Sequence, residues 1–318
     1  MKKARSCWER GWPLACATAL GATLMGCEPS NSVPAGAPVM YSFGPIGADG
    51  SALSLVDMQG ATLPTPPLTR FQALFDRLVD PTTLEDLDGN PKAGLATVQA
   101  PAAAPAGVSS TTNFVPNGDK TFTLFLFPGP SITVLPTCGL PTGAAVTVTL
   151  ALDKVRSHDM TTPAVAAAGV TPVLSFVTEP LTVTTDLPEA TMDMTTGATV
   201  PPEVEANQVV TLTFNNQVPG FPPADGSANP CGALPPTGGH IHVAATIGGL
   251  AVNDLDVVVA PDPADPTKWT VSPPGTNDEG PGKWPPGAAV TITVDATATD
   301  YFAQPLGLPA TASFKVKS

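Results

Sequence analysis

Histidine is scarce in this chain, which has 3 histidines in 318 residues, and tyrosine is scarcer still, with 2. Histidine is the side chain most often used for acid–base catalysis near neutral pH, so few such mechanisms are open to the chain. The sequence also lacks a G-x-S-x-G elbow, an H-E-x-x-H helix, a G-x-G-x-x-G turn and a phosphate-binding loop. We therefore expect no enzyme, although a pair of carboxylates needs no histidine and remains an alternative.

Basic residues are also few, with 14 Lys and Arg against 27 Asp and Glu and a formal net charge of −13. A surface with this charge repels phosphate groups and anionic lipid headgroups, which excludes nucleic acid as a partner. The acidic residues are scattered along the chain rather than clustered, a distribution typical of an ordinary solvated surface.

The N-terminus has the features of an export signal. Basic residues at 2–10 precede an uncharged stretch at 12–25, which is shorter than the roughly 20 apolar residues of a membrane-spanning helix. The stretch ends in Leu-Met-Gly-Cys at 24–27, which resembles the lipobox of bacterial lipoproteins. The resemblance implies cleavage before Cys27 and acylation of that cysteine. An ordinary export signal with a chance cysteine is the alternative.

This resemblance divides the N-terminal region into a signal peptide at 1–26 and a lipid-anchored flexible tether at 27–35, rich in Pro and Ser. The covalent lipid would hold the chain on a membrane, since several acyl chains give stable anchoring where one is marginal. We expect an exported protein of the cell envelope, with the outer membrane or the cell surface as its location.

The rest of the chain is dominated by runs in which Val, Ile, Thr and Phe alternate with a period of two. The runs are TFTLFLF (121–127), SITVL (131–135), AAVTVTLAL (144–152), VVTLTF (209–214), HIHVAATI (240–247), LDVVVA (255–260), AAVTITVDA (288–296) and TASFKV (311–316). Alternation of this kind predicts antiparallel strands with one face in a core and one in water. The predicted fold class is all-β.

An internal repeat predicts two copies of one domain. PTGAAVTVTL at 141–150 matches PPGAAVTITV at 285–294, and Phe75-Asp76 matches Phe214-Asn215. A strand centred on Phe176 also matches one centred on Phe314, so three landmarks recur in the same order at nearly constant spacing. We place domain 1 at 36–180 and domain 2 at 181–318.

The repeat also decides a conflict in the first copy. Five apolar residues have the spacing of a helical stripe: Phe71, Leu74, Phe75, Leu78 and Val79. The matching segment of the second copy, VVTLTFNNQV, alternates as a strand, so we predict a strand over 69–76 as well.

These landmarks resemble bacterial immunoglobulin-like domains of the S-layer (SbsA) type. In that family a strand ends in Phe-Asp, a Pro-x-Gly-Ala-Ala-Val-Thr strand follows later, and an Asp-containing loop precedes a last strand with a central Phe. The second copy has Thr299-Asp300-Tyr301 in this loop, but Gln304-Pro305 where Gly-Asn is usual. The resemblance implies two tandem Ig-like β-sandwich domains, and it is nearly silent on activity.

Cys138 and Cys231 are the two cysteines that remain after the signal and the lipidated Cys27. Both lie in similar loops, PTCGLP and NPCGALP. In an oxidising compartment they could form a disulfide that joins the two domains, or remain as two free thiols.

Candidate metal ligands are few. His240 and His242 would share one face of a strand, but a zinc site needs further ligands, and two solvent-facing polar residues are the simpler interpretation. Asp86 and Asp88 lie in a segment that resembles a calcium loop only faintly, and a polar turn explains it as well. We expect no metal and no cofactor other than the covalent lipid on Cys27.

Ser157, His158 and Asp159 have the residue types of a hydrolase triad, but adjacent residues cannot reach one another as a triad requires. Trp269 and Trp284 could belong to a sugar-binding face or to a core. The predicted function is therefore a non-catalytic interaction or structural module with a protein or polysaccharide partner in the envelope. A carbohydrate-binding or adhesive module is the alternative, which exposed tryptophans would favour.

Overall fold

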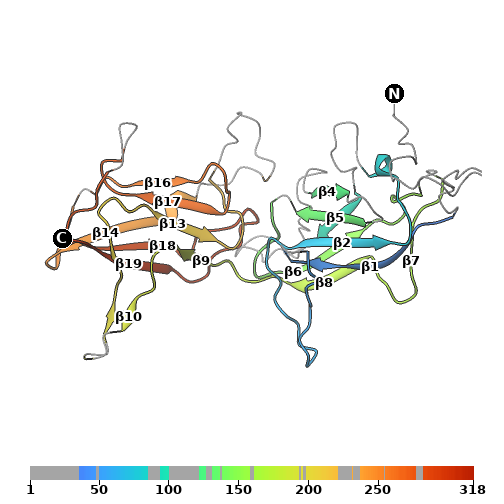
Figure 1. Ribbon diagram of the computed structural model, residues 1–318, viewed down its shortest axis with the longest axis horizontal. Coiled ribbons are helices and arrows are strands. Elements are labelled where there is room, and N and C mark those ends of the chain that lie inside the picture. Colours follow the sequence, from blue (N-terminus) through green and yellow to red (C-terminus); the bar gives the residue numbers. More distant parts are fainter. Residues whose placement is uncertain are drawn as a thin grey trace, which may run out of the picture. The chain divides into compact units, whose positions relative to one another are not determined.

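The secondary structure is nearly all β in the computed structural model (Figure 1). The structure describes residues 36–47, 50–84, 94–99, 122–126, 131–136, 138–157, 161–192, 195, 198–220, 231, 237–253, 255–276 and 282–318. Cys27 and the predicted signal peptide and tether lie outside these residues. Within the described part, no helix has the length and apolar character needed to cross a membrane.

The first sandwich consists of two sheets. One has the order β4-β5-β2-β1-β7 and the other the order β3-β6-β8. Their strands are β1 (Val39–Ile46), β2 (Arg70–Phe75), β3 (Ala96–Gln99), β4 (Phe122–Leu126), β5 (Ser131–Pro136), β6 (Ala145–Leu150), β7 (Val165–Ala166) and β8 (Val173–Val177), with a short 3₁₀ helix η1 (Pro81–Thr83). All pairings are antiparallel except β1 with β7.

The second sandwich has sheets of order β16-β17-β13-β9 and β12-β19-β18-β14-β15. Their strands are β9 (Val183–Thr185), β12 (Glu203–Val204), β13 (Val210–Phe214), β14 (Ile241–Ile247), β15 (Leu250–Ala251), β16 (Val258–Pro261), β17 (Lys268–Ser272), β18 (Ala289–Val294) and β19 (Ala310–Val316). A hairpin of β10 (Thr191–Met192) and β11 (Thr199–Val200) and the 3₁₀ helix η3 (Thr237–His240) complete it.

The strand order is that of an immunoglobulin-like sandwich. With β9, β13, β14, β16, β17, β18 and β19 taken as strands A to G, one sheet is A-B-E-D and the other is C-F-G. The first sandwich gives the same arrangement from β1, β2, β3, β4, β5, β6 and β8. The predicted all-β, Ig-like fold class is therefore confirmed.

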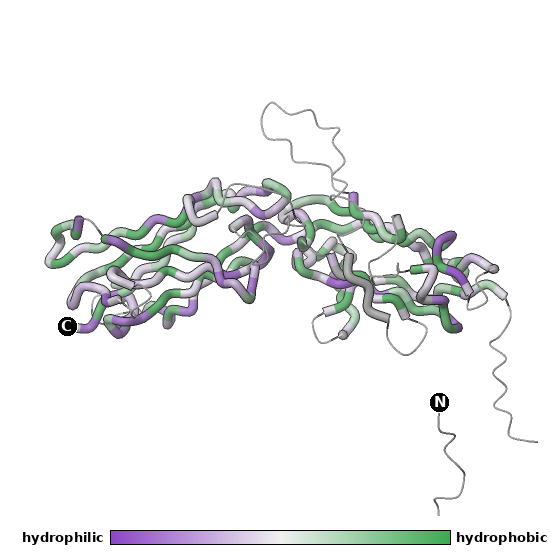
Figure 2. Tube along the Cα trace, turned by 90° about the horizontal axis from the view of Figure 1, so that it is seen from above, coloured by the Kyte–Doolittle hydropathy of each residue, from purple (hydrophilic) through white to green (hydrophobic). Residues whose placement is uncertain are grey.

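Alternation along each strand divides its residues between core and surface. In β6 the buried residues are Val146, Val148 and Leu150, and in β18 they are Val290, Ile292 and Val294. The first core contains buried residues from Met40 to Phe176, and the second contains residues from Leu181 to Val316. Figure 2 shows the hydrophobic residues spaced along the strands of both sandwiches. Burial of these apolar side chains is the main stabilising contribution.

The segment with conflicting periodicity is a strand, β2, as the repeat predicted. The helical spacing depended on Leu78 and Val79, which lie beyond the end of this strand. Leu78 is exposed, so no continuous apolar stripe exists there.

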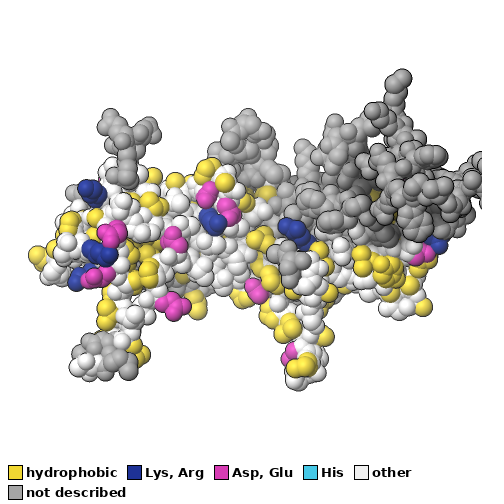
Figure 3. All heavy atoms as spheres, viewed as in Figure 1, with side chains coloured by type: hydrophobic (Ala, Val, Ile, Leu, Met, Phe, Trp, Pro, Cys, Tyr) yellow, Lys and Arg dark blue, Asp and Glu magenta, His cyan; other side chains and the backbone are white. Residues whose placement is uncertain are grey.

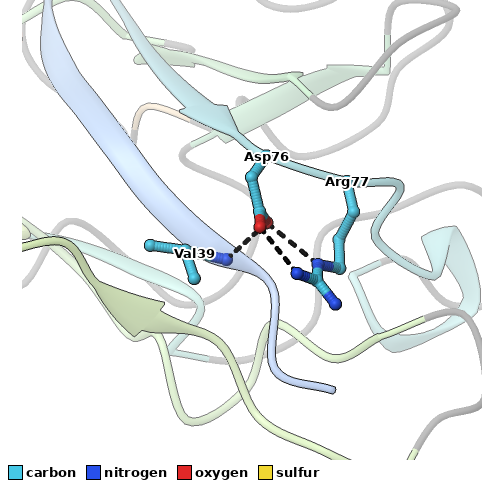
Figure 4. Close-up of polar contacts among 3 residues, drawn as sticks. All are labelled: Val39, Asp76 and Arg77. Carbon is cyan, nitrogen blue, oxygen red and sulfur yellow. Dashed lines mark hydrogen bonds and ion pairs between the residues drawn. The ribbon is translucent and has the colours of Figure 1, made fainter. Parts of the chain in front are cut away.

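The repeated Phe-Asp and Phe-Asn landmarks hold the first strand of each sandwich (Figure 4). Oδ1 of Asp76 accepts a hydrogen bond from the backbone N–H of Val39 at 2.8 Å, and the N–H of Asp76 donates to the carbonyl of Val39. Asn215 makes the same pair of contacts with Thr182, at 2.9 and 3.1 Å. Arg77 donates to both carboxylate oxygens of Asp76, and these hydrogen bonds lower the pKa of Asp76. The landmark thus needs a side-chain oxygen, which both Asp and Asn supply.

Candidate functional site at the junction of the two sandwiches

A disulfide joins the two sandwiches. Cys138 follows β5 in the first sandwich, and Cys231 lies between β13 and η3 in the second. Their Cα atoms are 5.5 Å apart, a separation usual for disulfides. Cys138 packs with Tyr301 and Phe302, so both sandwiches contribute to the small apolar cluster around the bond.

Asp300 is fully buried beside this cluster, and its carboxylate accepts five hydrogen bonds. Oδ1 accepts from the backbone N–H groups of Phe302 at 2.8 Å and Gln304 at 2.9 Å, which fixes the loop between β18 and β19. Oδ2 accepts from the N–H and the hydroxyl of Thr142, both at 2.9 Å, and from Asn216 at 3.3 Å. Because Thr142 belongs to the first sandwich, one carboxylate connects both.

Asn216 extends the network. Its side-chain nitrogen donates to the carbonyl of Leu140 in the first sandwich at 2.7 Å, and the residue is fully buried. Gly139 has φ +71°, and a Cβ at this position would lie 2.0 Å from Oδ1 of Asn216. Only glycine allows this close approach without strain.

The electrostatics of Asp300 follow from its burial. Desolvation raises the pKa of its carboxyl, and the hydrogen bonds from Gln304, Thr142 and Phe302 oppose that shift. Asp80 is the other buried carboxylate among the described residues, and its Oδ1 accepts hydrogen bonds from the backbone N–H and the hydroxyl of Thr82, two residues along the chain. Both carboxylates are buried, and their hydrogen bonds come from their own loops or from residues at the junction. These hydrogen bonds hold the loops and the junction in place.

Trp269 and Trp284 are core residues, 2% and 0% exposed, which is the core alternative for these two rings rather than the sugar-binding face. Nε1 of Trp284 donates to the carbonyl of Gln208 at 2.6 Å, and its ring packs edge-on against Phe314. Trp269 faces Gly220 and Gly238, whose missing side chains leave room for its ring. A ring that water does not reach cannot stack on a sugar.

The two histidines lie on different elements. His240 ends η3 and bonds Thr297, whereas His242 belongs to β14 and pairs with Asp295 at 2.9 Å on the exposed surface. Among the described residues, no group of three or more His, Cys, Asp or Glu side chains could hold a metal. Asp86 and Asp88 lie outside the described residues.

The Ser-His-Asp sequence is only partly described. Ser157 is buried, and its backbone forms an isolated antiparallel β-bridge with Val79, while His158 and Asp159 lie outside the described residues. The residues that sequence reasoning missed are Thr142, Asn216 and Asp300. Their only signal in the sequence was the Asp-containing loop of the second copy, to which no role was assigned.

No family model matches the chain, and no curated protein matches it. Similar solved structures include the N-terminal part of the bacterial S-layer protein SbsC, with 13% identity and a TM-score of 0.25 over 89% of this chain. This chain spans 45% of that structure's length. Two titin fragments are similar over 80% of the chain, at 8% and 9% identity and a TM-score of 0.20, and 92% and 61% of their lengths are covered. Since these TM-scores are low, the fold rests on the strand order.

Proposed function

We propose that this chain is a lipid-anchored, non-catalytic module of a bacterial cell envelope. Its two linked Ig-like sandwiches bind an envelope partner or act as a spacer. The junction is the observation that carries this proposal. Its buried polar groups, Asp300 and Asn216, bond to the neighbouring sandwich, and a disulfide crosses the same boundary. These contacts hold the two sandwiches together, which suits a protein that presents both of them from a lipid tether.

The disulfide supports export, because disulfides persist in oxidising compartments and are rare in the cytosol. The lipobox-like sequence at 24–27 supports the anchor, with Cys27 as the proposed site of the lipid. The two observations come from different parts of the chain, and they agree on a location outside the cytoplasm.

The surface supports a non-catalytic role. On the face shown in Figure 3, acidic and basic side chains are intermixed, with a group of both signs at the left end of the view. Several pair with each other, as Lys315 does with Glu203 and Lys317 with Glu205. The carbohydrate-binding alternative loses its two candidate rings, so we retain a protein partner or a spacer role.

The proposal is tested by fractionating cells that produce the full chain. Wild type should sediment with membranes and be released by detergent, whereas Cys27→Ala should appear in the soluble exported fraction. Cys16→Ala is the matched control, because this cysteine lies in the signal stretch outside the lipobox-like sequence, and it should behave as wild type. Membrane retention of Cys27→Ala equal to wild type would reject the lipid anchor.

A second step tests the partner. Chemical crosslinking in intact cells, followed by purification of the wild-type chain, should recover a crosslinked envelope component. The soluble Cys27→Ala chain should recover less of it, because it is no longer held beside the membrane. Equal recovery of many unrelated components from both chains would contradict a specific interaction role.

A further inference from the structure

A groove of about 200 Å³ opens at one edge of the second sandwich. It lies between β9 of one sheet and the first half of β19 of the other. The side chains and backbone that line it include Val183, Thr185, Leu212, Ile292, Ala310 and Ala312. Its floor is therefore the core of the sandwich, and its walls are two strand edges.

The edge of β9 is open among the described residues, since this strand ends its sheet. The N–H of Asn215 donates to Thr182, and the N–H of Asp186 donates to Thr211, so even-numbered residues of β9 face β13. Backbone groups alternate in direction along an antiparallel pair, which turns those of Val183 and Thr185 toward the open edge.

The edge of β19 is covered only at its end. β12 pairs with Lys315 and Val316, and the residues from Ala310 to Ser313 lie beyond it. The N–H groups of Lys315 and Lys317 donate to the carbonyls of Pro202 and Val204, on the side of β19 away from β18. Because backbone groups alternate in direction, those of Thr311 and Ser313 also point away from β18. Two strand edges to which no strand of the described residues pairs therefore flank the groove, and natural proteins usually cover such edges.

The first sandwich shows what covers this edge. There β7 lies parallel to β1, with the N–H of Val165 donating to Pro38 at 2.9 Å and the N–H of Ala167 donating to Met40 at 2.8 Å (Figure 1). Ala164 and Ala166 of this segment pack against the first core. The covering segment is thus extended and has alanine at alternate, core-facing positions.

In the described part of the second sandwich no segment covers this edge, and the loop between the last two strands is shorter there. The loop spans residues 151–172 in the first copy and 295–309 in the second. Of the side chains at the edge, Met40 and Leu174 of the first copy correspond to the smaller Val183 and Ala312 of the second.

We propose that this groove accepts an extended segment of a partner protein, with alanine-sized residues at alternate positions, which adds to the edge of β9 as β7 adds to the edge of β1. Main-chain hydrogen bonds would supply affinity, and the narrow groove would select small side chains. The inference goes beyond the proposed function, because it names a binding site and the kind of segment that fits it.

The test is a fluorescence anisotropy titration of a labelled peptide, Thr-Pro-Ala-Val-Ala-Ala-Ala-Gly, which copies residues 162–169. The purified full chain in detergent should bind it saturably. Ala312→Trp adds more bulk to the groove than Leu174 of the first copy, which is compatible with β7 on that edge, and it should weaken binding at least about tenfold, equivalent to roughly 1.4 kcal/mol. Ala251→Trp is the matched control, because Ala251 is exposed on β15 at the other edge of the same sheet and does not line the groove, and it should bind as wild type.

Peptide variants keep the test decisive if Ala312→Trp fails to fold. Leucine in place of Ala166 in the peptide should abolish binding, since that side chain would enter the groove. Leucine in place of Val165 should be tolerated, because Val165 is 47% exposed on β7. Absence of saturable binding to wild type, or equal binding to Ala312→Trp and wild type, would overturn the proposal. Purified protein is used, so this result is independent of the lipid anchor.

Discussion

Removing the disulfide should destabilise the second sandwich by several kcal/mol. Cys138 and Cys231 are 93 residues apart, and the closed loop contains strands β6 to β8 of the first sandwich and β9 to β13 of the second. For a loop of this length the chain-entropy relation gives about 4.7 kcal/mol at 25 °C. Measured values usually fall below the relation, so we expect a loss of roughly 2–4 kcal/mol for Cys138→Ala with Cys231→Ala.

Urea unfolding followed by tryptophan fluorescence measures this effect. Trp269 and Trp284 both lie in the second core, so their emission reports the unfolding of that sandwich. The double variant should unfold at a lower urea concentration, and reduced wild type should shift by a similar amount. A loss of unfolding free energy below about 1 kcal/mol, both in the double variant and in the reduced wild type, would refute the reasoning. The cross-link would then not restrict the unfolded chain as the relation requires.

Three further predictions concern the junction and the cores. Asp300→Asn should cost about 1–3 kcal/mol of unfolding free energy, because an amide nitrogen would face N–H donors. Folding raises the pKa of Asp300, so the unfolded chain loses the proton of this carboxyl at a lower pH than the folded chain does. In urea unfolding, the stability difference between wild type and Asp300→Asn should therefore fall as the pH rises from 3.8. Gly220→Ala should cost about 1–3 kcal/mol, because its Cβ would lie 2.2 Å from the Trp269 ring, whereas Gly239→Ala, with open space around it, should melt like wild type. Asp76→Ala should cost about 0.5–1.5 kcal/mol in urea unfolding by removing the hydrogen bond at the end of β2.

The fold was predictable because its signals recur. Alternation in β6 and β18 and the Phe-Asp and Phe-Asn strand ends appear twice, so each copy supports the interpretation of the other. The helical spacing near Phe71 could be rejected only through the second copy.

The junction was not predictable from alternation, because its residues lie in loops. Asp300 and Asn216 have no periodic pattern, and their partners are 158 and 76 residues away. The burial of Trp269 depends on Gly220 and Gly238, which only the folded chain brings to its ring. His240 and His242 were expected on one strand face, but the 3₁₀ helix ends between them.

The groove was also hidden from the sequence. No alternating run marks residues 153–172 of the first copy, and only the structure shows that they contain β7 and cover an edge. The shorter loop of the second copy provides no equivalent of β7, and the corresponding edge is open among the described residues.

Intact-mass spectrometry of the chain extracted from membranes, under non-reducing conditions, tests the central claim most directly. The account predicts a species that begins at Cys27, carries the mass of attached lipid, and gains two hydrogens when Cys138 and Cys231 are reduced. An unlipidated species with a different N-terminus, or one whose mass does not change on reduction, would contradict a lipid-anchored module of two covalently joined sandwiches.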